Sequence, residues 1–160
     1  MQTVTVLCVG RLRERFYIDA CGEYEKRLSR FCALSVSELP EQRLPDNPSP
    51  AQIAAALDRE ADAIEEKLPR GAAVIALCVE GRSMSSEALS ETMARYAGQG
   101  VSRLVFVVGG SFGLSERVKT RAALRLSMSP MTFPHHLARV MLLEQLYRAY
   151  QIQQGTKYHK

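Results

Sequence analysis

The chain has 160 residues and a mass of 17.8 kDa, enough for one domain of ordinary size with a substantial core. Apolar residues make up 46% of it, which excludes a disordered chain, and no apolar run reaches the length of a membrane-spanning helix. The formal charge of +4 and the pI near 9.0 permit a nucleic-acid partner without requiring one.

The N-terminal segment and the cysteines indicate a cytoplasmic protein. Residues 1–14, MQTVTVLCVGRLRE, predict a strand followed by charges, without the basic start, apolar stretch and cleavage site of a secretion signal. The cysteines have neither metal-ligand nor redox spacing, so we expect reduced, buried thiols and no bound metal at Cys8, Cys21, Cys32 and Cys78.

Strands and helices are predicted to alternate in the first half of the chain. Two strands are expected at residues 3–9 and 33–39, where apolar residues alternate or gather in short runs. Between them, apolar side chains recur at steps of three and four over residues 16–30, which predicts an amphipathic helix. A proline-rich loop then leads to a helix capped by Ser49, with an apolar stripe formed by Ile53, Leu57, Ile64 and Leu68.

Two nearly continuous apolar runs in the middle of the chain predict strands that are covered on both faces, as in parallel sheets. These are residues 72–79 and 103–108. The helix between them is capped by Ser85 or Ser86 and ends at Gly98. The alternation therefore predicts an α/β fold with a mainly parallel sheet flanked by helices. Such sheets bind ligands at the carboxyl ends of their strands.

A loop rich in glycine, GGSFG at residues 109–113, follows the second buried run. It lacks the GK[ST] of a phosphate-binding P-loop and the spacing of G-x-G-x-x-G. Glycine permits positive φ angles and lets another molecule approach the main chain. The loop therefore either faces a ligand or forms a tight turn that packing requires, and both interpretations stay open at this point.

A second segment with little charge, LSMSPMTFPHH at residues 126–136, precedes the last helix. Its prolines favour extended or turned backbone over helix. Its polar groups are hydroxyls and main chain, which suit an uncharged planar or thioether-bearing ligand held by main-chain hydrogen bonds. The alternative interpretation is an ordinary loop before the next helix.

The last predicted helix, residues 135–153, is apolar around most of its girth, which indicates burial on more than one side. It lies either in the centre of the domain or between its own sheet and a partner, and we favour a homodimer. Glu144 and Arg148 are expected to form an ion pair within this helix. The basic tail TKYHK follows, and it is either solvated or able to stack on and pair with a nucleic acid.

Four segments in this order resemble the ribosomal large subunit methyltransferase H family of the SPOUT superfamily: ALCVEGRSMSSEAL, VFVVGGSFGLSE, LSMSPMTFPHHLARVMLLEQLYRAYQI and the terminal YHK. The resemblance covers essentially the whole chain as a single SPOUT domain, residues 1–160. It implies a SPOUT-type fold with a C-terminal trefoil knot, a homodimer, and S-adenosylmethionine as cofactor. The implied reaction is methylation of N3 of a pseudouridine in a 23S rRNA stem-loop on the assembled ribosome.

The same resemblance implies which residues form the site. The cofactor is expected in the knot, against three loops that contain Leu77, Gly109, Met128, Ser129, Pro130, Met131, Thr132 and Phe133. N3 of pseudouridine must lose a proton, so a base or donors to the developing anion are needed. The candidates are His135, Arg139, Tyr158 and His159, of which His159 would take the proton. His135 is equally well explained as a structural residue that starts the last helix.

Two other functions remain open at the level of sequence. One is a SPOUT methyltransferase that acts on another RNA, such as tRNA. The other is a non-catalytic, ribosome-associated RNA-binding dimer. Arg11, Arg13 and Arg15, which follow the first strand, form a solvated turn by default and an RNA contact in the alternative interpretation.

Overall fold

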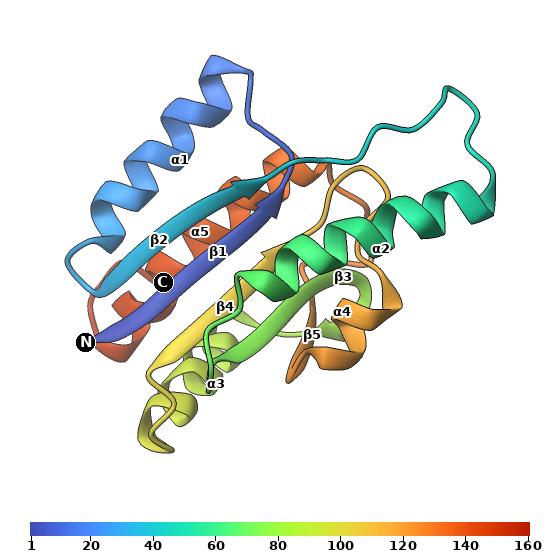
Figure 1. Ribbon diagram of the computed structural model, residues 1–160. Coiled ribbons are helices and arrows are strands. Elements are labelled where there is room, and N and C mark those ends of the chain that lie inside the picture. Colours follow the sequence, from blue (N-terminus) through green and yellow to red (C-terminus); the bar gives the residue numbers. More distant parts are fainter.

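A five-stranded parallel sheet with helices on both faces forms the protein, and the computed structural model describes residues 1–160 (Figure 1). The strands are β1 (Gln2–Val9), β2 (Cys32–Leu39), β3 (Ala73–Ser83), β4 (Arg103–Val108) and β5 (Leu124–Ser127). The helices are α1 (Arg15–Leu28), α2 (Pro50–Glu66), α3 (Ser86–Gly98), α4 (Glu116–Arg121) and α5 (His135–Gln153). The order β2-β1-β4-β3-β5, with every pair parallel, confirms the predicted α/β class.

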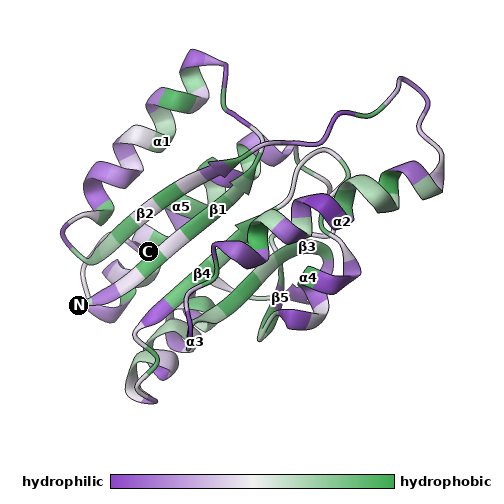
Figure 2. Cartoon of the chain, in the orientation of Figure 1, coloured by the Kyte–Doolittle hydropathy of each residue, from purple (hydrophilic) through white to green (hydrophobic).

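The central strands divide their side chains between two cores. In β4, Leu104 and Phe106 join the core under α1, α3 and α5, whereas Val105 and Val107 join the core under α2 and α4. Figure 2 shows β3 and β4 coloured mostly as hydrophobic, whereas the helices on either side carry both hydrophilic and hydrophobic residues. Burial on both faces is why β4 is continuously apolar in sequence.

Helix α5 is buried on more than one side, as its composition predicted. Leu142, Leu143, Leu146 and Ala149 are inaccessible to solvent beneath the sheet. Tyr147 packs edge-on against Phe31, with ring centroids 5.8 Å apart. Every residue from 135 to 152 is buried or half-buried within the single chain. The homodimer stays a prediction.

The helix starts follow the predicted caps. The Ser49 hydroxyl accepts a hydrogen bond from the Gln52 amide at 3.2 Å, and the Gln52 side chain accepts from the Ser49 amide at 2.8 Å. The choice left open at α3 is settled for Ser85, whose hydroxyl accepts from the Ala88 amide at 3.0 Å. None of the helices combines the length and the hydrophobicity that a membrane span requires.

The sequence analysis missed two short elements and the end of a strand. Helix α4 has 6 residues and β5 has 4, so neither is long enough to display a period. Strand β3 was predicted to end at Val79 but continues to Ser83. Its extension is charged because it pairs with β5 alone, at the edge of the sheet.

The end of β3 curls closely over β5. Leu126 is paired with both Leu77 and Arg82, so the residues between these two form a bulge. A Cβ on Gly81 would lie 2.8 Å from the Arg125 carbonyl carbon, a distance that no side chain tolerates. The glycine therefore lets the two backbones touch at this crossing. The trefoil knot itself stays a prediction of the family resemblance.

Candidate active site

A cleft of about 720 Å³ opens where the chain leaves β3, β4 and β5. Its walls come from residues within three segments, 77–80, 108–114 and 126–135, together with Lys119 and Ala138. These are the loops that the sequence singled out, brought together at the carboxyl edge of the sheet. The volume is typical of a site for a small organic molecule.

The glycine loop that follows β4 is a tight turn. A Cβ on Gly109 would come 2.4 Å from the Gly113 carbonyl oxygen. Gly113 has φ of +79°, and its amide donates to the Gly110 carbonyl at 3.1 Å. The folding of the turn therefore requires glycine at 109 and 113. The tight-turn interpretation is therefore confirmed. The turn also lines the cleft, and its contact with a ligand stays a prediction.

A carboxylate from a distant loop holds this turn in place. Glu41, between β2 and α2, accepts a hydrogen bond from the Ser111 amide at 2.8 Å. A Cβ on Gly110 would lie 2.6 Å from the same Glu41 oxygen, so a larger residue there would displace the Glu41 side chain from this contact. Sequence reasoning missed Glu41, because 70 residues separate it from Ser111 and no spacing links them.

The segment after β5 offers main-chain donors to the cleft. The Ser129 hydroxyl accepts from the Met131 amide at 3.0 Å and fixes the turn between them. The amides of Thr132 and Phe133, both cleft residues, donate no hydrogen bond within the chain. These N–H groups are free to bind a ligand. An uncharged wall with free main-chain donors fits the adenine and ribose parts of S-adenosylmethionine.

The predicted cofactor residues are almost all found on the cleft wall. Leu77, Gly109, Met128, Ser129, Met131, Thr132 and Phe133 line it, whereas Pro130 belongs to the same loop but is exposed and is not a wall residue. Sequence reasoning missed further wall residues, among them Cys78, Glu80 and Lys119. Cys78 and Glu80 directly follow the predicted Leu77, so proximity in sequence was an available signal.

The charges at the mouth of the cleft neutralise one another. Lys119, whose side chain is 14% exposed, forms an ion pair with Glu80 and a second one with Glu116 at 3.7 Å. Burial opposes the charge of Lys119, but Glu80 outweighs it and raises the pKa of the ammonium group. Burial, followed by Glu80, raises the pKa of the Cys78 thiol, which therefore stays protonated.

His135 is the only one of the four catalytic candidates on the cleft wall. Burial first, and then the neighbouring His136 ring with its centroid 4.0 Å away, lower the pKa of His135. The imidazole is therefore neutral at pH 7. A neutral ring accepts a cationic ligand beside it without electrostatic repulsion.

Arg139 ties α5 to the ends of β1 and β2. Its side chain is 3% exposed, with Nη1 2.7 Å from a Glu38 carboxylate oxygen and Nη2 donating to the Gly10 carbonyl at 3.0 Å. Burial acts against the charge of Glu38, but the hydrogen bonds from Arg139 and the Leu12 amide outweigh it and lower the pKa of that carboxyl. Within one chain, Arg139 is thus engaged in the fold and is not a cleft residue.

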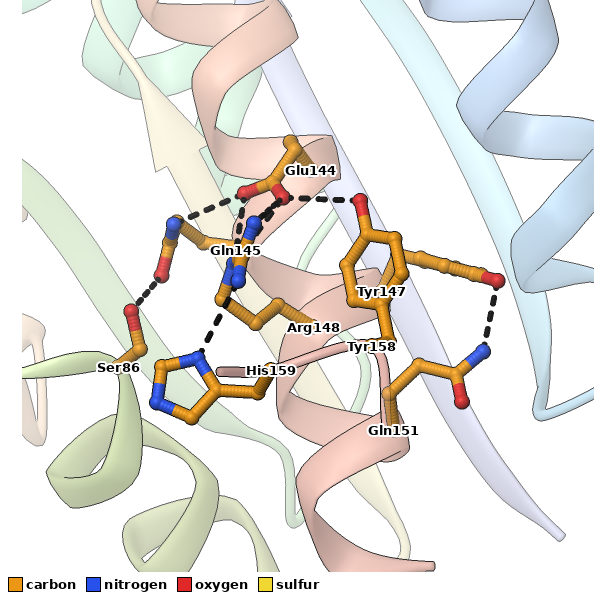
Figure 3. Close-up of polar contacts among 8 residues, drawn as sticks. All are labelled: Ser86, Glu144, Gln145, Tyr147, Arg148, Gln151, Tyr158 and His159. Carbon is orange, nitrogen blue, oxygen red and sulfur yellow. Dashed lines mark hydrogen bonds and ion pairs between the residues drawn. The ribbon is translucent and has the colours of Figure 1, made fainter. Parts of the chain in front are cut away.

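The C-terminal tail packs against α5, where Tyr158 and His159 contact Glu144 and Arg148 (Figure 3), and no tail residue lines the cleft of its own chain. The Tyr158 hydroxyl donates to Glu144 at 3.1 Å, and the Tyr158 ring packs edge-on against Tyr147. Burial and Glu144 both raise the pKa of Tyr158, so the phenol stays protonated. The predicted ion pair between Glu144 and Arg148 is confirmed, with a closest N–O distance of 2.6 Å.

The tail network also orients His159. Arg148 Nη1 lies 3.2 Å from Nδ1 of His159, and Glu87 lies 2.7 Å from Nε2. A guanidinium only donates and a carboxylate only accepts, so Nδ1 is the acceptor and Nε2 carries the proton. The neighbours thus select one tautomer of the ring. The structure brings Tyr158 and His159 together and keeps both apart from His135 and Arg139.

A second depression, of about 440 Å³, connects the cleft with the tail network. Leu126 and Met128 line both cavities. Val140 and Met141, half-buried on α5, are among its apolar wall residues, and Glu144 also lies on its wall. We call this depression the α5 groove.

Comparison with known proteins agrees with the fold. A family model described as "Predicted SPOUT methyltransferase" matches residues 1–159. A probable methyltransferase from Bordetella pertussis Tohama I has a TM-score of 0.59 and 17% identity, over 93% of this chain and 95% of that one. A probable methylase family protein from Haemophilus influenzae Rd KW20 has a TM-score of 0.57 and 13% identity, over 99% and 71%. These two likenesses show the shared fold.

Sequence relatives are much more similar. A protein of Bifidobacterium animalis subsp. lactis named ribosomal RNA large subunit methyltransferase H is 45% identical over 98% of this chain and 99% of its own length. Proteins of the same name from Clostridioides difficile and Streptococcus equi subsp. zooepidemicus are 43% identical over the same shares. The chain therefore belongs to the SPOUT methyltransferases and, within them, to the ribosomal RNA large subunit methyltransferase H family, which confirms the resemblance seen in its sequence.

Proposed function

We propose that this chain methylates N3 of a pseudouridine in a stem-loop of 23S rRNA, on the assembled ribosome in the cytoplasm, with S-adenosylmethionine as the methyl donor. The observation that carries the proposal is the cleft at the carboxyl edge, walled by main chain and apolar side chains. Family membership supplies the reaction class, and the relatives' printed names supply rRNA as the acceptor.

Residues of the cleft would hold the donor by its uncharged parts. The free amides of Thr132 and Phe133 would donate to the adenine or the ribose, and Leu77 and Met128 would pack against the flat ring. The bound donor supplies an electrophilic methyl group on its sulfonium. The neutral His135 and the paired charges of Lys119 leave no free cation to repel that sulfonium.

The cleft of one chain lacks a group suited to deprotonate N3. Its imidazole, His135, is a weak base because burial lowers its pKa, and its carboxylate Glu80 is committed to Lys119. His159 has an oriented ring, but it lies on the tail network. We propose that the active unit is a homodimer in which the tail of one subunit completes the cleft of the other.

We propose that the second subunit binds in the α5 groove. Val140 and Met141 lie on its wall and are only half-buried, so part of α5 stays exposed in a single chain. It joins the cleft at Leu126 and Met128 and reaches the tail network at Glu144. A two-fold partner seated there would place its tail beside this cleft. Nδ1 is the basic nitrogen of His159, so the ring would take the N3 proton there after Nδ1 exchanges its contact with Arg148 for N3. Tyr158 and Lys160 would hold the anion or a phosphate.

Methyl transfer to ribosomes from a strain that lacks this gene tests the proposal. We expect mass mapping of the 23S rRNA to show one methylated pseudouridine after incubation with the protein and the donor. Intact ribosomes should be methylated and the isolated stem-loop should not. Methylation of tRNA instead would support a different SPOUT enzyme, and no transfer to any RNA would support a non-catalytic RNA-binding dimer.

A further inference from the structure

The turn between β1 and α1 carries an unusual surface. Arg11, Arg13, Arg15 and Phe16 are all exposed, and we call these four residues the β1–α1 ridge. Phe16 has 65% of its surface exposed, and the Arg15 side chain 83%. Between the outward arginines, Leu12 points inward and packs against the core. Leu12 therefore anchors the turn to the core, and the four ridge side chains are exposed to solvent.

The backbone of the ridge is fixed. The Leu12 amide donates to Glu38 at 2.8 Å, and Glu38 is held in turn by the buried Arg139. Glu14 faces His136 on α5 at 3.7 Å. A rigid turn loses less conformational entropy when it binds a partner than a mobile one does.

The nearby carboxylates form no close ion pair with two of the arginines, although Arg11 attracts Glu38 at longer range. Asp19 is paired with Arg15 at 3.3 Å, Glu38 with Arg139, and Glu41 accepts from the Ser111 amide. Arg11 and Arg13 form no ion pair within the chain. Two exposed, unpaired guanidinium groups beside an exposed aromatic ring are suited to a nucleic-acid strand, since arginine binds phosphate and the ring stacks on a base.

The ridge adjoins the cleft. The Tyr17 ring lies 6.0 Å from His136, whose ring lies 4.0 Å from His135 on the cleft wall. The ridge and the cleft also share the carboxyl edge of the sheet, because the turn directly follows β1. An RNA strand whose target base enters the cleft would therefore pass over the ridge.

We propose that the β1–α1 ridge binds the RNA acceptor outside the cleft, with Arg11 and Arg13 on phosphates and Phe16 stacked on an unpaired base. The inference rests on the proposed function, since it takes the acceptor to be RNA. It adds a positioning surface that contacts neither the methyl donor nor the target base.

The test is equilibrium binding of the full-length protein to ribosomes from a strain lacking the gene, over a series of salt concentrations. The double variant R11Q/R13Q removes two positive charges from the ridge. Its matched control, R70Q/R103Q, removes two from exposed sites at the amino end of the sheet. We expect R11Q/R13Q to weaken binding about tenfold at moderate salt and to reduce the slope of log K against log salt by about 1.5. The control should change both by much less.

Phe16→Ala separates stacking from charge. It should weaken binding about tenfold and leave the salt slope unchanged, because no phosphate contact is lost. Equal effects of the two double variants, or wild-type binding by R11Q/R13Q, would overturn the proposal. Deproteinised 23S rRNA is the second probe. If R11Q/R13Q weakens binding to ribosomes and not to this RNA, the ridge binds a ribosomal protein and the assignment to RNA is wrong.

The binding test and the proposed function can fail independently of each other. Binding is measured without methyl transfer, so an inactive wild-type enzyme would contradict the proposed function and leave the binding result standing. Calorimetry with S-adenosylmethionine alone should give the same affinity for R11Q/R13Q, Phe16→Ala and the wild type. A changed donor affinity would show that the ridge acts on the cleft, and would also overturn the proposal.

Discussion

The cleft and the C-terminal tail of this protein are built in opposite ways. The cleft is made of turns whose shape depends on glycine and on main-chain hydrogen bonds, as at Gly109 and Gly113. The tail is made of charged and aromatic side chains, among which Glu144, Arg148 and His159 are linked in series. The cleft is suited to binding the uncharged part of a ligand through main-chain hydrogen bonds and apolar contacts. The tail is suited to proton transfer.

Under the proposed function, donor binding falls to the cleft, which has no free base, and proton transfer falls to the tail, which orients a histidine but lines no cleft. Variants of each region should therefore change different measured quantities, donor affinity in one and turnover in the other. The four predictions below run from the largest expected effect to the smallest.

Removal of residues 158–160 should greatly slow turnover and spare donor binding. Loss of a positioned acid–base group costs about 10²–10⁴-fold in rate. The rate of methyl transfer to ribosomes should fall by that factor, while calorimetry shows an unchanged affinity for S-adenosylmethionine. Lys157→Ala, in the exposed part of the tail, is the matched control and should remain active. Loss of donor binding in the truncated chain would contradict the division between the two regions.

Gly109→Ala should have the opposite effect and weaken the binding of the donor. Its Cβ would meet the Gly113 carbonyl at 2.4 Å, so the turn must open. Overpacking of this kind costs up to about 3 kcal/mol, which corresponds to about a hundredfold in Kd for the donor.

The control for Gly109→Ala is Gly22→Ala in α1, where a Cβ meets nothing within 4 Å. That change should stabilise the fold by about 0.5–1 kcal/mol, since alanine is the better helix former, and should leave the donor affinity unchanged. Wild-type donor affinity in Gly109→Ala would show that the turn is not part of the binding site.

Arg139→Met tests whether this residue serves the fold or the substrate. Loss of its ion pair with the half-exposed Glu38 should lower the free energy of unfolding by about 2 kcal/mol, measured by denaturant titration. Turnover per folded molecule should change little. Glu38→Gln in the same background should restore part of the stability, because it removes the unpaired carboxylate. A large loss of turnover without loss of stability would place Arg139 at the substrate.

Acid should weaken the fold through His135, the smallest of the four effects. Its pKa is lowered in the folded protein, so the unfolded chain binds the proton first as the pH falls below about 6.5. This contribution to stability is complete above that pH and is lost progressively between the unfolded and the folded pKa. His135→Gln should show a flatter dependence of unfolding free energy on pH in that window. An unchanged slope would contradict the burial argument.

Local patterns predicted much of the fold. The parallel sheet was predicted from the apolar runs at β3 and β4, and the buried helix from the apolar residues on every side of α5. These predictions succeeded because an element that is buried on both faces is apolar at nearly every position. Helix α4 and strand β5 were missed because elements of 6 and 4 residues contain too few positions for a period. The close crossing at Gly81 depends on contacts between distant segments, which no local pattern records.

The cleft was predicted through family resemblance more than through physical pattern. The resemblance named Leu77, Gly109 and all of residues 128–133, and every one of these except Pro130 lies on the wall. The support from Glu41 and the pairing of Lys119 with Glu80 were not predicted, since each joins segments far apart in sequence. The tail was predicted as a catalytic element, but its packing on α5 emerged only from the structure.

Titration of the isotope-labelled protein with S-adenosylmethionine, followed by the NMR signals of its backbone amides, tests the central claim most directly. The account predicts that the largest shifts fall within residues 109–113 and 128–133, with the free amides of Thr132 and Phe133 moving furthest. The amides of the tail should move little in comparison. Shifts concentrated on the tail and the α5 groove, with the turns unaffected, would contradict a donor site built from main chain.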